Sequence, residues 1–151
     1  MSKKVSGVNI KNRKAYYDYE SVDEEIAGIV LFGSEIKSIR YGEVSISEGY
    51  CYIQDKEVYI TGMYISEYKL AGIENHDPYR KRKLLLTKKQ IAKFDKKMKT
   101  KGYTIIPVKL FIDDKGNAKL KIMLGKGKKT YDKKQSIKER DIKRDMDRQI
   151  K

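Results

Sequence analysis

Residues 106–124 read IPVKLFIDDKGNAKLKIML, and this stretch decides the fold. Apolar side chains occupy every second position on both sides of a short loop: Ile106, Val108, Leu110, Ile112, and then Ala118, Leu120, Ile122, Leu124. A period of two is typical of a strand with one buried face, and the loop DDKGN at 113–117 has the length of a hairpin connection. The stretch therefore predicts two antiparallel strands in which Ile112 pairs with Ala118.

The opposite face of this hairpin carries lysines. In the predicted register Lys109 lies directly opposite Lys121, and Lys119 lies beside Phe111. Like charges directly opposite each other on neighbouring strands destabilise a sheet. We therefore expect this face to bind an anion.

The composition favours a polyanionic partner. The chain has 151 residues with 35 Lys and Arg against 21 Asp and Glu, a formal net charge of +14. Such an excess repels itself in a compact state and is typical of proteins that bind nucleic acid. No run approaches the ~18 apolar residues of a membrane-spanning helix, the start lacks a signal-peptide pattern, and Cys51 is a lone cysteine, so we expect a cytoplasmic protein without a membrane partner.

Residues for catalysis or metal binding are few. His76 is the one histidine and Cys51 the one cysteine, so no Cys/His zinc site can be built. The chain contains no nucleophile elbow and no phosphate-binding Walker loop. We therefore predict a binding protein, not an enzyme, with no metal and no cofactor, in which His76 is a turn residue bonded to local backbone.

Several other elements are expected. Residues 26–32, IAGIVLF, predict a short buried strand, and residues 50–61, YCYIQDKEVYIT, predict a hairpin whose two-residue loop is Asp55 and Lys56. Helices are predicted from Ser34, as N-cap, to Arg40 and from Thr87, as N-cap, to about Lys101. The stretch NRKAYYDYE at 12–20 interleaves bases and rings, which suits either contact with a nucleic-acid backbone and bases or a first strand with half-buried tyrosines.

The C-terminal part is strongly basic. Residues 124–134, LGKGKKTYDKK, combine glycines, lysines and a tyrosine in a pattern that suits a phosphate backbone, although a solvated linker has a similar composition. Further on, Arg140, Arg144 and Arg148 recur every four residues on one side of a helical pattern, and Ile142, Met146 and Ile150 recur on the other. A single helix of this length is marginal in water, so the tail is expected to be disordered when free and to fold on its partner.

Several spaced segments resemble one known family. NRKAYYDY, AGIVLFGSEIKSIRYG, EGYCYI, NHDPYRKRKLLL and GKGKKTYDKKQSIKERD are similar to the SsrA-binding protein (small protein B) family of bacterial trans-translation. The resemblance implies a mainly β protein, an oligonucleotide-binding (OB-fold-like) closed barrel with flanking helices. It implies a flexible N-terminus at 1–11, the RNA-binding barrel at 12–125, and a basic tail at 126–151 that is helical on the ribosome.

The resemblance also implies the partners. It implies binding to the tRNA-like domain of transfer-messenger RNA (tmRNA) and, with elongation factor Tu carried by that RNA, delivery to stalled ribosomes for rescue and nascent-peptide tagging. The protein would mimic the missing anticodon arm in the small-subunit decoding site, with its tail in the message channel. The alternatives are a general single-strand RNA-binding OB protein and a ribosome-anchored structural protein.

Carried over by position, the resemblance implies two sets of site residues. The RNA-binding set is Asn12, Arg13, Lys14, Tyr19, Tyr50, Arg80, Lys81, Arg82, Lys83, Lys119 and Lys121. The ribosome-contacting set is Gly127, Lys128, Lys129, Tyr131, Asp132, Lys133, Lys134, Arg140 and Arg144. The chain departs from the family pattern at two positions. Ile26 stands where the family usually has a glutamate, with Glu25 one position earlier, and Lys134 stands where the family usually has an arginine.

Overall fold

The computed structural model describes residues 8–68 and 75–128. Its elements are, in chain order, β1 (Asn9–Lys11), α1 (Lys14–Asp18), β2 (Tyr19–Ile29), α2 (Gly33–Arg40), β3 (Val44–Ser45), β4 (Tyr50–Gln54), β5 (Glu57–Thr61), β6 (Tyr64–Ile65), β7 (Arg82–Leu85), α3 (Lys88–Met98), β8 (Tyr103–Ile112) and β9 (Ala118–Gly127). The described part is therefore mainly β with a few helices, as the sequence predicts.

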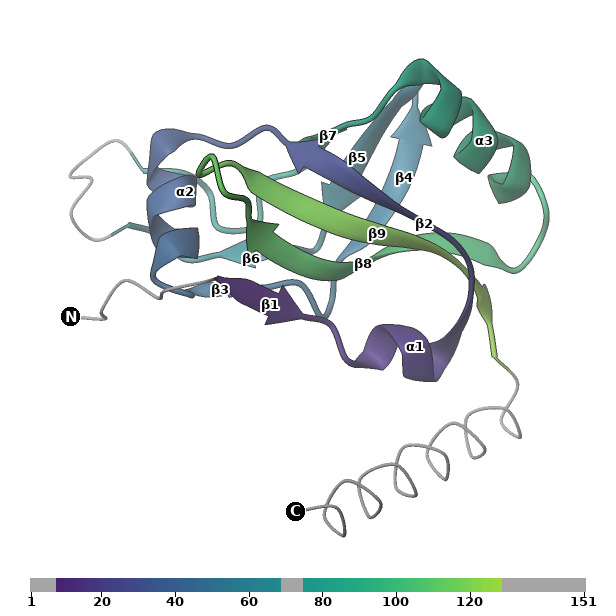
Figure 1. The fold of residues 1–151 in the computed structure, drawn as a ribbon, viewed down its shortest axis with the longest axis horizontal. Helices are drawn as coiled ribbons and strands as arrows, with labels where there is room; N and C mark the ends of the chain where they lie inside the picture. Colours follow the sequence, from purple (N-terminus) through teal and green to yellow (C-terminus); the bar gives the residue numbers. More distant parts are fainter. Residues whose placement is uncertain (1–7, 69–74, 129–151) are drawn as a thin grey trace, which may run out of the picture.

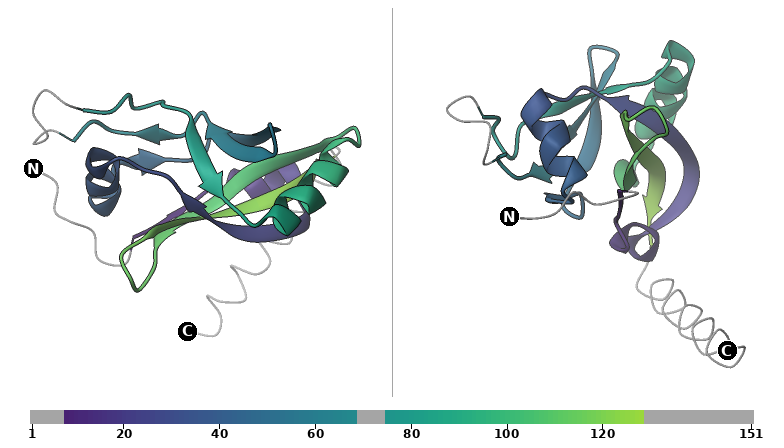
Figure 2. Two further views of the ribbon diagram at one scale, coloured as in Figure 1. Left: turned by 90° about the horizontal axis from the view of Figure 1, so that it is seen from above. Right: turned by 60° about the vertical axis from the view of Figure 1, so that its left-hand side comes forward.

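Seven of these strands form one antiparallel sheet. Their order is β1-β8-β4-β5-β7-β2-β9, and β9 also pairs with β8. β3 and β6 form a separate two-stranded pair beside α2. Helices α2 and α3 lie at opposite ends of the sheet, and α1 lies where the chain passes from β1 into β2 (Figure 1). Figure 2 shows β2 curving strongly around its neighbours.

The hairpin of β8 and β9 confirms the predicted register near its loop. Ile112 pairs with Ala118, Phe111 with Lys119, and Lys109 with Lys121. Further along, the register shifts between Pro107 and Lys109. One extra residue on β8 reverses the face of the sheet to which each preceding side chain of this strand points.

This shift makes part of the expected alternation wrong. Ile105, not Ile106, belongs to the main core, whereas Ile106 and Val108 pack with Ala15 and Met123 in a small second cluster. Proline has no N–H to donate to a ladder, so a bulge beside Pro107 is physically reasonable. The bulge is the reason that both faces of β8 carry buried side chains.

The main core lies between the sheet and the helices. Many of its fully buried members come from β5, β7, β8, β9 and α3. They are Val58, Ile60, Leu84, Phe94, Ile105, Leu110, Leu120, Ile122 and Leu124. Burying a side chain of this size contributes about 1.5–3 kcal/mol. The apolar alternation that predicts the strands thus also supplies most of the core.

The β4–β5 hairpin confirms its prediction. Cys51 pairs with Ile60, and Tyr52 pairs with Tyr59 across the sheet. The loop residues Asp55 and Lys56 have φ of 51° and 63°. Positive φ at both central positions is the mark of a type I′ turn, which matches the twist of antiparallel strands.

We expect Lys56→Gly to raise the free energy of unfolding. A non-glycine residue in the left-handed region costs about 1–2 kcal/mol, and the entropy of a glycine offsets part of that, so the net gain is about 0.5–1 kcal/mol. Thermal unfolding measures it. Lys115→Gly is the matched control, because Lys115 lies in an exposed loop and is not among the residues with positive φ; a gain of equal size there would contradict the turn argument.

The helices start and end differently from their predictions in two places. α2 has Phe32 as its N-cap residue, not Ser34, and the Glu35 carboxylate accepts a hydrogen bond from the Phe32 N–H at 2.8 Å. For α3 the predicted N-cap is confirmed, since the Thr87 hydroxyl accepts from the Gln90 N–H at 3.2 Å. α3 ends at Met98, before the expected Lys101, and Gly102 with φ of 94° follows.

The ends of the sheet also differ from expectation. Residues 1–11 were expected to be flexible, but Asn9–Lys11 form strand β1 against β8, and Val8 before them is buried. Residues 12–20 form α1 and the start of β2 instead of a first strand. The expected barrel boundary at residue 125 cuts through β9, which continues to Gly127 because Gly127 pairs with Tyr19.

Candidate nucleic-acid interface

One face of the sheet carries the lysines that the sequence singled out. Cross-strand partners place side chains of neighbouring strands on the same face. The ladder joins Lys11 of β1 to Lys109 of β8, Lys109 to Lys121 of β9, and Lys121 to Ile26 of β2. We call Lys11, Lys109 and Lys121 the lysine row, and Ile26 lies beside Lys121 at its end. Lys11 was not among the predicted site residues, although the alternation of Val8 and Ile10 around it is a signal for a strand.

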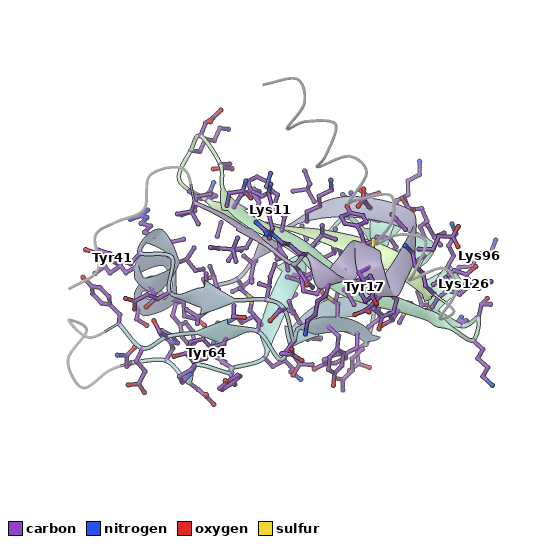
Figure 3. The ribbon with its side chains drawn as sticks, turned by 90° about the horizontal axis from the view of Figure 1, so that it is seen from below. Lys11, Tyr17, Tyr41, Tyr64, Lys96 and Lys126 are labelled. Carbon is purple, nitrogen blue, oxygen red and sulfur yellow. The ribbon has the colours of Figure 1, made fainter. Side chains whose placement is uncertain are left out.

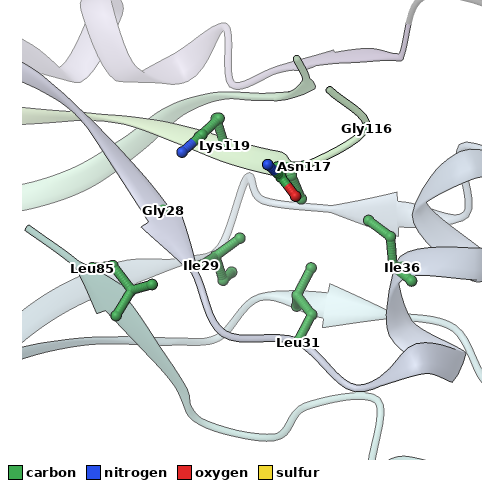
Figure 4. A pocket seen from close by; sticks show the side chains of 9 residues that line it. Gly28, Ile29, Leu31, Ile36, Leu85, Gly116, Asn117 and Lys119 are labelled. Carbon is green, nitrogen blue, oxygen red and sulfur yellow. The ribbon is translucent and has the colours of Figure 1, made fainter. Parts of the chain in front are cut away.

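A second row runs beside the first. Phe111 pairs with Lys119, Lys119 with Gly28, and Gly28 with Leu85. A cavity of about 350 Å³ opens here, and Figure 4 shows Lys119 and Leu85 on either side of Gly28. A Cβ on Gly28 would lie 3.2 Å from the Leu85 Cβ, so glycine permits this close approach. Leu85 is 53% exposed and Ile26 is 55% exposed, which places two apolar side chains among the lysines.

The residues around α1 line two further hollows. One of about 460 Å³ is lined by Lys11, Asn12, Arg13, Tyr16, Val108, Lys109 and Lys121. Another of about 410 Å³ has Asn12, Lys14, Tyr19 and Tyr50 among its lining residues. The fold thus gathers seven of the predicted RNA-binding residues, from three stretches of the sequence (12–19, 50 and 119–121), around α1 and β9.

Asn12 has a structural role within this surface. It is 5% exposed, its N–H donates to the Val108 carbonyl at 2.8 Å, and its side-chain Nδ2 donates to the Pro107 carbonyl at 2.9 Å. Asn12 therefore ties the end of β1 to the bulge in β8. Its Oδ1 is buried and has no hydrogen-bond partner among the described residues.

Glu24 is the carboxylate that lies nearest to Lys121 on this surface, and Glu48 pairs with Lys14 at 3.8 Å. It accepts a hydrogen bond from the Tyr16 hydroxyl, and one of its oxygens lies 3.7 Å from the Lys121 Nζ. Burial and the hydrogen bond to Glu24 raise the pKa of Tyr16 to about 12. Tyr16 is therefore a neutral donor at physiological pH, and Glu24 offsets part of the lysine charge.

The basic strip at 80–83 does not act as one unit. Arg82 has 0% exposure and cannot be a surface contact in this fold, so its place in the predicted RNA-binding set is wrong. Arg80 is mostly buried beside it, whereas Lys81 lies over the stacked rings of Tyr52 and Tyr59, at 5.6 and 4.8 Å from their centroids. Lys83 pairs with Glu57 at 3.3 Å on the surface. Alternation along β7 separates these side chains, which a run of charges in the sequence does not reveal.

Arg82 is buried because it neutralises Glu35 of α2. Arg82 Nε and Arg80 Nη2 each lie 2.5 Å from a Glu35 oxygen, and Arg82 also donates to the carbonyls of Met63 and Pro78. A buried charge is tolerated when it is paired and its donors are used. This cluster connects α2, β7 and the turn before β7.

Acid should weaken this cluster. Burial acts to raise the pKa of Glu35, but hydrogen bonds from Arg80, the Phe32 N–H and Arg82 outweigh it and hold the pKa below its ordinary value of 4.5. A lowered folded-state pKa stabilises the fold above the unfolded-state pKa and loses that contribution as the pH falls through the folded value. We therefore expect the melting temperatures of the wild type and Glu35→Gln to converge as the pH drops below about 4.5, measured by circular dichroism. A constant difference from pH 7 to pH 3 would contradict the assignment.

Glu25 faces away from the lysine row. Its neighbour Ile26 pairs with Lys121, so the Ile26 side chain lies on the face that carries the lysine row. The Glu25 carboxylate instead accepts hydrogen bonds from Gln90 and Lys93 of α3, each at 2.8 Å. The register shift in β2 lies between Ser21 and Asp23, before Glu25, and leaves this facing unchanged. The Glu25 carboxylate therefore contacts α3 and does not lie on the face that carries the lysine row.

We expect Glu25→Ala to change stability more than RNA affinity. The substitution removes hydrogen bonds between β2 and α3, at a cost of about 0.5–1.5 kcal/mol in the free energy of unfolding. The dissociation constant for RNA should stay within about twofold of the wild type, because the carboxylate points away from the basic face. Urea unfolding and a filter-binding titration measure the two quantities; a loss of affinity with unchanged stability would reverse the conclusion.

His76 is not bonded to local backbone as expected. It is 4% exposed, its Nε2 lies 2.9 Å from the Ile65 carbonyl, and its Nδ1 lies 2.8 Å from the Ser34 hydroxyl. It therefore joins the start of α2 to β6. Within residues 8–68 and 75–128 no group of three His, Cys, Asp or Glu side chains is placed to hold a metal ion.

Two further observations concern chemistry and membranes. Burial raises the pKa of the Cys51 thiol, which keeps it protonated and unreactive. In the part of the chain that the structure describes, no helix has both the length and the apolar character needed to cross a membrane.

Of the predicted ribosome-contacting residues, Gly127 and Lys128 are described. The Gly127 N–H donates to the Gly102 carbonyl at 3.2 Å, and the Lys128 Nζ donates to the Tyr16 carbonyl at 2.8 Å. Lys128 thus holds the end of β9 against α1, and Gly127 holds it against the turn that precedes β8. Lys129, Tyr131, Asp132, Lys133, Lys134, Arg140 and Arg144 lie outside the described residues.

Comparison with known proteins gives a family match over nearly the whole chain. The family model described as SmpB protein matches residues 9–151. The SsrA-binding protein of Phocaeicola vulgatus is 50% identical over 148 residues, covering 98% of this chain and 99% of the relative, and that of Bacteroides thetaiotaomicron is 51% identical with the same coverage.

A solved structure is also similar. It is a chain described as "tmRNA-SmpB: a journey to the center of the bacterial ribosome", with a TM-score of 0.69 and 38% identity, covering 82% of this chain and 86% of that one. The likeness extends over nearly the whole sequence and over the arrangement of its strands. The chain therefore belongs to the SmpB family of SsrA-binding proteins.

Proposed function

We propose that this protein binds the tRNA-like domain of tmRNA and delivers it to stalled ribosomes for trans-translation. The observation that carries the proposal is the surface around α1 and β9. There, Arg13, Lys14, Tyr19, Tyr50, Lys119 and Lys121 lie beside three hollows, although they come from distant parts of the sequence. Lysines and arginines suit the phosphate backbone, and the exposed tyrosine and apolar side chains suit ribose and base faces.

We infer that the strands form an oligonucleotide-binding barrel. Starting from β8, the pairings run through β4, β5, β7, β2 and β9 and return to β8. OB-type barrels bind nucleic acid on one side, which agrees with the placement of the lysine row on one face of the sheet. Because β9 ends at Gly127, we place the boundary between the barrel and the basic tail at about residue 128.

The remaining parts of the proposal concern the ribosome. The basic tail would enter the decoding site and the message channel, and the barrel would hold the RNA in the place of an anticodon arm. Elongation factor Tu would meet this complex through the RNA. Such a site of action implies a cytoplasmic location, and nothing among the described residues points to catalysis.

The test is the affinity for the isolated tRNA-like domain beside an unstructured RNA of equal length, measured across a range of salt. The affinity of the protein for both RNAs should fall steeply as the salt concentration rises, because binding releases counterions from either RNA. The proposal expects tighter binding of the folded RNA at moderate salt. Equal binding would instead favour a general single-strand binder, and equal residence on translating and stalled ribosomes would favour a structural ribosomal protein.

A further inference from the structure

Three lysines lie side by side on three adjacent strands. Lys11 is the direct cross-strand partner of Lys109, and Lys109 is the direct cross-strand partner of Lys121. Side chains in such positions start from Cβ atoms roughly 4.5–5.5 Å apart. The three lysine side chains therefore leave neighbouring strands side by side on one face of the sheet.

This region is hollow and open to a ligand. Lys11, Lys109 and Lys121 all line the cavity of about 460 Å³, with Arg13 on its wall. Figure 3 shows Lys11 on β1 pointing out from the side of the molecule on which α1 lies. A small anion in this hollow would meet several cations at once.

The charge of the row is only partly neutralised within the protein. Among the described residues, Glu24 is the carboxylate near Lys121, at 3.7 Å. No described carboxylate oxygen lies within 4.0 Å of the Lys11 or Lys109 ammonium, and Lys109 Nζ instead lies 5.3 Å from the centre of the Phe111 ring. The row therefore keeps a net positive charge that an external anion would compensate.

We expect the row to lower the stability of the fold. Like charges opposite each other are destabilising, and none of the three ammonium groups is needed to fill the core. Features that oppose stability in an otherwise consistent fold are typical of functional sites. Neutral glutamines at the same positions would remove the repulsion and keep the polar surface.

We propose that Lys11, Lys109 and Lys121 form a clamp for one phosphate group of the bound RNA backbone. Lysine suits this task because its ammonium is a compact charge with rotatable donors, so three of them can converge on one anion from three strands. The proposal rests on the RNA-binding function above and adds Lys11 and Lys109 to the residues that carry it. It does not require recognition of any base.

The test uses two full-length triple variants. Lys11→Gln/Lys109→Gln/Lys121→Gln removes the clamp, and Lys88→Gln/Lys89→Gln/Lys96→Gln removes the same charge from exposed positions of α3. Both are measured for melting temperature and for affinity to the tRNA-like domain as a function of salt. The clamp variant should bind on the order of tenfold more weakly at moderate salt, with a salt slope smaller by about one unit, and should melt at the same or a higher temperature. The α3 variant should change affinity by less than about twofold.

The outcomes separate the clamp from the wider function. An equal loss of affinity in both variants would show that total charge matters and would overturn the clamp, as would wild-type binding by the clamp variant. In either case the function stands if the wild type still prefers the folded RNA. A large fall in the melting temperature of the clamp variant would contradict the repulsion on which the clamp rests. In that case the single variant Lys11→Gln, which changes the edge strand alone, shows whether RNA affinity depends on the row.

A second measurement identifies the source of the phosphate. Amide chemical shifts of β1, β8 and β9 are followed while inorganic phosphate replaces chloride at constant ionic strength, and then while RNA is added. Saturable shifts with inorganic phosphate that the clamp variant lacks would support a site that also accepts free phosphate. Shifts that the clamp variant lacks with RNA alone would support a backbone phosphate, and identical shifts in the wild type and the clamp variant with both ligands would overturn the clamp.

Discussion

Glu35→Ala is expected to lower the free energy of unfolding by about 3–5 kcal/mol, a large part of the roughly 5–15 kcal/mol that stabilises a typical domain. The substitution leaves the fully buried Arg82 guanidinium with carbonyl oxygens alone as acceptors, those of Met63 and Pro78 among them. A buried charge without its counter-charge is much more costly than a lost surface pair. The melting temperature should fall by about 10 °C or more.

Glu57→Ala is the matched control. Glu57 also pairs with a cation of β7, Lys83, but both side chains are 41% exposed, so the loss should stay below about 1 kcal/mol. Chemical unfolding of the variants gives both free energies. If the two substitutions cost the same, the Glu35 cluster does not hold α2 against β7. The double variant Glu35→Leu/Arg82→Met should recover much of the loss, because it removes both charges together.

Truncation after Lys128 should separate RNA binding from tagging. The shortened chain keeps all of β9 and the hydrogen bonds of Gly127 and Lys128 to Gly102 and Asp18, so the basic face is preserved. We expect affinity for the tRNA-like domain within about threefold of the wild type at moderate salt, since the removed residues carry charge but not the folded face. Tagging of a nascent chain on stalled ribosomes in a reconstituted translation system should be abolished.

The control for this experiment ends at Leu124. That shorter chain also removes Gly125 and Gly127, which pair with Ser21 and Tyr19 of β2, so it should lose stability as well. The two truncations together distinguish a missing tail from a damaged sheet. Tagging activity retained after truncation at Lys128 would refute the proposed role of the tail, and loss of RNA affinity there would refute the division of labour.

Much of the fold follows from local patterns in the sequence. The hairpin register that places Ile112 opposite Ala118, the Asp55–Lys56 turn and the Thr87 N-cap are all confirmed. Each depends on residues within a few positions of one another, where period, turn geometry and capping are nearly independent of the rest of the chain. The resemblance to the family can be recognised in the same way, because each of its motifs is a run of consecutive residues.

The errors arose where distant segments decide the environment of a side chain. Arg82 looked like part of a surface strip, but its partner Glu35 lies 47 residues away in the sequence. Ile26 looked like a core residue in an apolar run, but its partner on β9 is Lys121, which faces outward. The bulge beside Pro107 reversed the facing of Ile106, and no local period shows where a bulge falls.

The sequence by itself determined the two hairpins at 50–61 and 106–124, the turn of the first of them, the excess of positive charge and the family. Only the tertiary structure decided which charges meet. It buried Arg82 against α2, turned Glu25 toward α3, and brought Lys11 from the N-terminal strand into one row with Lys109 and Lys121. The physical reason is that strand periodicity is written into consecutive residues, whereas the neighbours of a side chain across a sheet depend on strand order and register, which are set by the packing of the whole core.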